Sequence, residues 1–123
     1  MNEFLKNNEH HFHFIFRVVI GLLFVLHGLG KWGAISSMSF NLFFFAGVIE
    51  IVGGAFVLLG LFTRVSALVC SLQMAYAFFV FHVFGKGFNL NPLTNGGEAA
   101  LLFLVSFLVI AATGATSWSV QKE

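Results

Sequence analysis

Long apolar stretches, separated by short polar connectors, make up most of the chain. Four such stretches cover residues 14–33, 42–61, 65–84 and 97–114. Each is close to the roughly 20 residues that an α-helix needs to cross the hydrocarbon core of a bilayer. The pattern therefore predicts an all-α integral membrane protein, folded as a four-transmembrane-helix bundle.

The segments outside these helices are short. Residues 1–13 form a polar N-terminal lead-in, residues 14–114 the membrane domain, and residues 115–123 a short C-terminal tail. An even number of spans places both termini on the same side of the membrane. The link "FTR" at 62–64 is so short that the second and third helices must be antiparallel neighbours.

Composition supports the membrane class and excludes a soluble domain. Hydrophobic residues make up 59% of the chain and charged residues 9%, whereas a soluble domain carries about 25% charged residues. The formal net charge is only +1, so no nucleic-acid partner is expected. These values predict a multi-pass protein of the cell membrane whose main surroundings are the lipid bilayer.

The basic residues predict the orientation. Cytoplasmic loops of membrane proteins carry an excess of lysine and arginine. The side with the termini holds more of these residues than the opposite, outer side: Lys6, Arg17, Arg64 and Lys122 against Lys31 and Lys86. Both termini are therefore expected in the cytoplasm, with Arg17 extending to the lipid phosphates.

Ionisable residues gather in the outer half of the predicted bundle. With a rise of about 1.5 Å per residue, His27 lies roughly 9 Å deep and Glu50 roughly 12 Å deep. Lys31 follows His27 on the same stripe of the first helix, while His82 and Glu98 lie at the outer ends of the third and fourth helices. Charges inside a bilayer are costly and usually pair or line a cavity. Lys31 and Glu50 are the natural pair.

Glycines occur beside these polar positions. Gly47, Glu50 and Gly54 share one stripe of the second helix, and Gly28 lies near the outer end of the first. Small residues let helices approach closely. The glycines therefore indicate either a close helix contact or space for a ligand.

The stretch "NGGE" opens the fourth helix and has two interpretations. Asn95 suits the N-cap position and Glu98 the N3 position of a variant capping box. Gly96 and Gly97 form helices poorly, and a bare first turn exposes backbone N–H groups that accept an anion or a carbonyl oxygen. Asn95, Gly97 and Glu98 are therefore helix-capping residues or one wall of a small-molecule site.

Several chemistries find little support. The single cysteine, Cys70, excludes an intramolecular disulfide and a CxxC redox pair. The histidines of the N-terminal stretch make a poor metal site, and no metal is expected. A haem between His27 and His82 is disfavoured because both lie close to the surface. Gln73, in the middle of the third helix, is expected to make an interhelical hydrogen bond.

The order and spacing of these pieces resemble the DoxX family of small four-helix membrane proteins. The resemblance covers about residues 16–120, through "FRVVIGLLFVLHGLGKWG", "GVIEIVGGAFVLLGLFTR", "NGGEAALLFLVSFLVIAATG" and "SWSV". It implies that the motif positions are Arg17, Gly28, Lys31, Glu50, Gly54, Arg64, Asn95, Gly97 and Glu98. The ending "GATSWSVQKE" departs from the basic and acidic ending frequent in the family, which weakens the expectation of cytoplasmic docking there.

The resemblance also implies a function. Family members are described as subunits of thiosulfate:quinone oxidoreductase or of other membrane-associated oxidoreductase complexes. We therefore expect a membrane subunit that binds a quinone non-covalently in the outer half of the bundle and receives electrons from a partner subunit. The expected catalytic residues are Glu50, Lys31 and His27, and the expected ligand-binding residues are Gly28, Gly54, Asn95, Gly97, Glu98 and His82.

Two alternatives remain. In the first, the chain is a non-enzymatic membrane scaffold or interaction subunit, and Glu50 only neutralises Lys31 and fixes helix register. In the second, it is a small transporter, which is the weaker alternative because no broken helix or continuous polar path is visible. The glycine stripes also suit a homo-oligomer.

Overall fold

The apolar stretches fold as helices, because a helix satisfies its backbone hydrogen bonds internally where lipid offers none. The computed structural model describes residues 1–34, 42–116 and 118–121. No β-strand occurs in these ranges, which confirms the all-α prediction.

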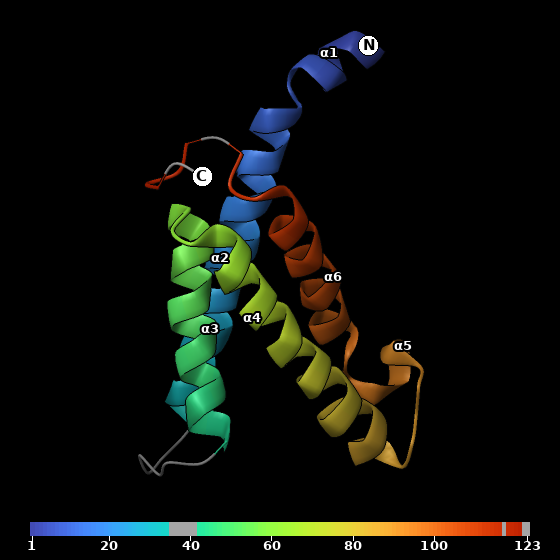
Figure 1. Ribbon diagram of the computed structural model, residues 1–123. Helices are drawn as coiled ribbons and strands as arrows, with labels where there is room; N and C mark the ends of the chain where they lie inside the picture. Colours follow the sequence, from blue (N-terminus) through green and yellow to red (C-terminus); the bar gives the residue numbers. More distant parts are fainter. Residues whose placement is uncertain (35–41, 117, 122–123) are drawn as a thin grey trace.

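Six α-helices and two short segments of other helical types follow one another in the described ranges (Figure 1). Their bounds are α1 (Asn2–Asn7), α2 (Glu9–Ala34), α3 (Leu42–Leu59), α4 (Thr63–Tyr76), the π-helix η1 (Ala77–Val83), the 3₁₀-helix η2 (Phe84–Lys86), α5 (Pro92–Asn95) and α6 (Glu98–Thr113). The lead-in expected over residues 1–13 is thus covered by α1 and the start of α2. α4, η1 and η2 continue one another without a break.

The long helices pack in two pairs. α2 lies along α3 and α4 lies along α6, while α3 also contacts α4 (Figure 1). The apolar core lies between the helices and includes the fully buried side chains of Phe24, Val57, Cys70, Phe107 and Ile110. In Figure 1 the two pairs diverge toward the end of the molecule that holds α5.

Large apolar side chains also cover the outside. On α2 alone, Ile15, Val19, Leu22, Leu26 and Leu29 are all exposed. A soluble monomer rarely exposes so continuous an apolar face. A lipid environment explains it, because lipid tails solvate such side chains.

Within the part of the chain that the structure describes, two helical stretches are long and apolar enough to cross a bilayer, judged by length and composition: Glu9–Lys31 and Thr63–Lys86. Phe44–Leu59 and Glu98–Thr113 are apolar but shorter.

Candidate functional site

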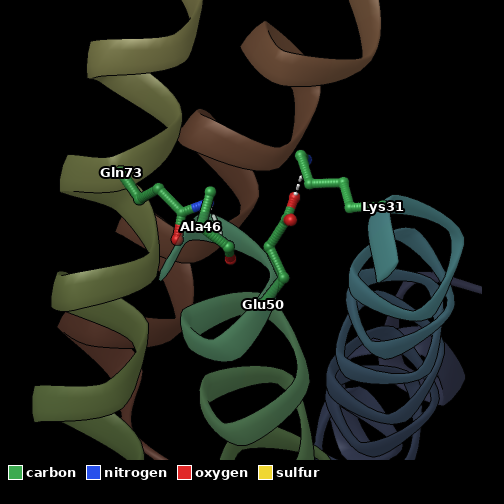
Figure 2. Close-up of polar contacts among 4 residues, drawn as sticks. All are labelled: Lys31, Ala46, Glu50 and Gln73. Atoms are coloured by element: carbon green, nitrogen blue, oxygen red, sulfur yellow. Dashed lines mark hydrogen bonds and ion pairs between the residues drawn. The ribbon is translucent and has the colours of Figure 1, made fainter. Parts of the chain in front are cut away.

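An ion pair connects α2 to α3. Lys31 Nζ donates a hydrogen bond to Glu50 Oε1 over 2.6 Å (Figure 2). The Glu50 side chain is only 2% exposed, whereas the Lys31 side chain is 24% exposed. The contact confirms the pairing predicted from the sequence. The two exposed fractions also show that the carboxylate is the more deeply buried member of the pair.

Glycines allow the two helices to approach closely at this pair. A Cβ on Gly28 would lie 2.9 Å from the carbonyl oxygen of Gly47 and 3.0 Å from Glu50 Cβ. A Cβ on Gly54 would lie 2.8 Å from the carbonyl oxygen of Gly21. Side chains larger than hydrogen at these positions would push α2 and α3 apart. The expected close helix contact is confirmed, and a ligand-binding role for Gly28 and Gly54 stays a prediction.

Two buried oxygen atoms, one in the ion pair itself and one on α4, lack a hydrogen-bond donor in the described part of the chain. Glu50 Oε2 and Gln73 Oε1 have no hydrogen-bond partner among the residues that the structure describes. The other end of the Gln73 amide donates from Nε2 to the carbonyl oxygen of Ala46 over 3.3 Å (Figure 2). That bond confirms the expected interhelical role of Gln73. A buried polar atom without a partner is costly in a low-dielectric environment, so a hydrogen-bond donor that reached either oxygen would be stabilised there.

His27 lies one helical turn before Lys31, but its ring packs in another direction. The ring is exposed and meets Phe103 of α6 edge to face, with centroids 5.1 Å apart and an interplanar angle of 86°. Lys31 instead reaches α3 through its bond to Glu50. His27 and Lys31 therefore contact different helices, and the expected catalytic role of His27 stays a prediction.

A second polar group lies where α6 begins. Asn95 is completely buried; its Oδ1 accepts a hydrogen bond from the Gly97 N–H over 2.7 Å, and its Nδ2 donates to the Asn89 carbonyl oxygen over 2.9 Å. The His82 ring nitrogen Nδ1 lies 3.3 Å from the Asn95 carbonyl oxygen. His82 is part of the π-helix η1, and π-helices are rare and frequent at functional sites. The expected outer cluster is therefore divided between α2–α3 on one side and η1, α5 and α6 on the other.

Close packing explains the glycine at the start of α6. A Cβ on Gly97 would lie 2.8 Å from Phe78 Cδ2 and 2.9 Å from His82 Cβ, both in η1. Gly96 has a positive φ of 81°, which side chains disfavour. The turn therefore needs glycine for geometry, whatever ligand it also contacts.

The capping box predicted at this turn does not form. The N-cap of α6 is Gly97, without a side-chain hydrogen bond, and Glu98 is the first residue of the helix rather than the N3 residue. Because the Asn95 side chain turns back to the Gly97 N–H, the helix begins later than the capping box required. The exposed Glu98 carboxylate still suits the positive end of the helix dipole.

Arg17 does not extend to the lipid phosphates as expected, because a C-terminal segment covers it. We call residues 114–116 and 118–121 the C-terminal strap. Arg17 is completely buried, and its Nη1 and Nη2 donate to the carbonyl oxygens of Ala115 and Trp118 over 2.7 and 3.0 Å. Arg17 therefore binds the strap, and its expected role as a structural motif position stays a prediction.

Arg64, the second residue expected to be structural, also binds a helix end. Its Nη1 donates to the carbonyl oxygens of Ala112 and Ala111 at 2.5 and 3.3 Å. The last carbonyls of a helix lack partners within it and carry partial negative charge. Arg64, at the start of α4, therefore caps the C-terminus of α6.

Sequence reasoning missed two contributors. Gly21 opposes Gly54 across the α2–α3 contact, and a search for glycines spaced along facing stripes would have found it. The strap contacts of Arg17 join residues 98 and 101 positions apart. No local pattern in the sequence predicts pairs that distant.

Comparisons with known proteins agree with these features. The family model of DoxX matches residues 12–83. An uncharacterized protein of Haemophilus influenzae is 41% identical over 131 residues, covering 100% of this chain and 97% of the relative. No solved structure matches the chain. The family match covers more than half of the sequence and includes Arg17, Gly28, Lys31, Glu50, Gly54 and Arg64. The chain belongs to the DoxX family of membrane proteins.

Proposed function

We propose that this chain is the quinone-binding membrane subunit of an oxidoreductase assembly in the cell membrane. In this proposal α2, α3, α4 with η1, and α6 all cross the bilayer, and both termini face the cytoplasm. The observation that supports a binding site is the buried carboxylate of Glu50, whose Oε2 has no hydrogen-bond partner in the described part of the chain.

The residues present suit a quinone headgroup. An ammonium group carries three N–H donors, and Lys31 Nζ is positioned by Glu50 at the partly exposed end of the ion pair. Lys31 would donate to a ligand oxygen, and Glu50 would hold or release a proton at Oε2. A bound quinone supplies the redox chemistry, because it takes up two electrons and two protons in becoming a hydroquinone.

His27 is the proposed second donor to a quinone carbonyl oxygen. Its ring is exposed and one turn away from Lys31. An imidazole carries at least one N–H group that can donate such a bond. Electrons would come from a partner subunit of the thiosulfate:quinone oxidoreductase kind, to which the family resemblance points.

Quinone binding to the purified protein tests the proposal. The chain would be placed in lipid nanodiscs and titrated with a short-chain benzoquinone, by equilibrium dialysis. We expect saturable binding to the native chain. The charge-neutral double variant Lys31→Met with Glu50→Leu should lose it, because that variant removes both polar groups while filling their volume.

The scaffold alternative predicts a different result. If the ion pair only fixes helix register, the native chain and the double variant will both fail to bind the quinone and will capture the same partner proteins. A matched control is Leu72→Ala, on the exposed face of α4, which should bind like the native chain under the proposed function.

A further inference from the structure

We infer that the site at Glu50 favours a ligand that donates hydrogen bonds, so that a hydroquinone headgroup binds more tightly than the corresponding quinone. This inference rests on the proposed function and specifies which redox form the site holds. It comes from the buried oxygen of Glu50 in the ion pair, from the buried oxygen of Gln73 where α4 contacts α3, and from the direction in which each hydrogen bond there runs.

Both buried oxygens, Glu50 Oε2 and Gln73 Oε1, are hydrogen-bond acceptors. Glu50 Oε2 is a carboxylate oxygen, and the other oxygen of the same group already accepts from Lys31 over 2.6 Å. Glu50 is paired with the Lys31 ammonium group as a carboxylate, and carboxylate oxygens accept hydrogen bonds and donate none. Oε2 therefore needs a donor.

The orientation of the Gln73 amide is fixed by its neighbour. Nε2 donates to the Ala46 carbonyl oxygen over 3.3 Å, which leaves Oε1 as the buried atom without a donor in the described part of the chain. The flipped amide would place two oxygen atoms against each other. Ala46 lies one turn before Glu50 on α3, so the amide approaches α3 next to the turn that carries the carboxylate (Figure 2).

These acceptors treat the two redox forms differently. A quinone headgroup carries carbonyl oxygens, which accept hydrogen bonds and repel a neighbouring carboxylate oxygen. A hydroquinone carries hydroxyl groups, which donate to such an oxygen. Hydrogen bonds to charged groups contribute about twice as much as neutral ones. A donor meeting Glu50 Oε2 should therefore bind roughly tenfold more tightly than an acceptor of the same shape.

The native chain allows a test without any substitution. Nanodisc-embedded protein would be titrated with three probes of one shape: a short-chain benzoquinone, its hydroquinone kept reduced under anaerobic conditions, and the hydroquinone dimethyl ether. We expect the hydroquinone to bind about tenfold more tightly than the quinone. The dimethyl ether has lost both donors and should bind no better than the quinone.

Two variants locate the preference. In Glu50→Gln, the amide oxygen should keep the contact with Lys31, which places the amide nitrogen, a donor, where Oε2 was. The preference should then shift toward the quinone. Gln73→Leu removes the neutral acceptor and should weaken hydroquinone binding several-fold while changing quinone binding little, with Leu72→Ala as the unchanged control.

The outcomes separate this inference from the proposed function. Equal binding of quinone and hydroquinone, or tighter binding of the quinone by the native chain, overturns the inference and leaves quinone binding intact. Binding of none of the three probes overturns both. Equal affinity for hydroquinone and its dimethyl ether would also contradict the inference, because hydrogen-bond donation would then contribute nothing.

Discussion

Glu50 and Lys31 form one ion pair, but their surroundings differ. The Glu50 side chain is almost completely enclosed, whereas the Lys31 side chain is 24% exposed. A long lysine side chain can move its charge to the surface when its partner is lost. A short, enclosed carboxylate cannot do so. The pair should therefore respond asymmetrically to the removal of either member.

We predict that Lys31→Met destabilises the protein more than Glu50→Leu. Removing one member of a buried pair costs about 3–5 kcal/mol when the other charge stays buried, and that applies to Glu50 after loss of Lys31. The cost of Glu50→Leu should be smaller, because the Lys31 side chain is partly exposed and long enough to move its charge to the membrane surface. Denaturant unfolding in detergent would measure both variants.

The double variant completes this test. Lys31→Met with Glu50→Leu leaves no unpaired charge, so its stability should exceed that of Lys31→Met alone. If instead the two single effects simply add, the two residues do not interact energetically, and the ion pair contributes nothing to the fold.

At the scale of helices, α2 and α3 approach closely enough for backbone atoms to take part in their contact. The carbonyl oxygens of Gly21 and Gly47 face glycines on the opposite helix, at distances that exclude a Cβ. Gly30, on the same helix as Gly21, has no atom of the described residues within 4 Å of its ideal Cβ position. This difference between glycines of one helix gives a matched comparison.

We predict opposite effects for alanine at these glycines. Gly54→Ala should destabilise by about 1–3 kcal/mol, because the added methyl group would overpack a contact made by backbone atoms. Gly30→Ala should be neutral or stabilising by up to about 1 kcal/mol, because alanine favours helix more than glycine does. Thermal unfolding of the two variants in the same detergent would check this, and a Gly54→Ala protein as stable as Gly30→Ala would contradict the close contact.

The same scale shows what the sequence could predict. Apolar length was sufficient to place α3 and α6 within a few residues, and depth along the helices was sufficient to pair Lys31 with Glu50. The start of α6 was not predictable, because it depends on Phe78 and His82 of η1 packing against Gly97. Local capping preferences predict a helix start only when no tertiary contact competes with them.

At the scale of the whole molecule, the strap connects helices that are distant in sequence. Besides binding Arg17, the strap makes hydrogen bonds with the end of α3 and with the link that follows it. The N–H of Val120 donates to the Leu59 carbonyl oxygen over 2.8 Å, and the Phe62 N–H donates to Gln121 Oε1 over 2.7 Å. Trp118 packs against Phe14 of α2, with ring centroids 4.7 Å apart. The strap therefore joins the α2–α3 pair to the end of α6, away from the end where the two pairs diverge.

We predict that the stabilising effect of Arg17 depends on the strap. Arg17→Met in the full chain should destabilise by several kcal/mol, because it removes a buried charged group and its two hydrogen bonds to the carbonyl oxygens of Ala115 and Trp118. After deletion of residues 115–123, Arg17 has lost these acceptors and can move its charge to the headgroups. The same substitution should then cost much less. The coupling between Arg17 and the strap is obtained from four unfolding free energies, those of the full chain and of the shortened chain, each with and without Arg17→Met. An equal cost of Arg17→Met with and without the strap would show that the arginine acts on the helices directly, and that the strap only lies over it.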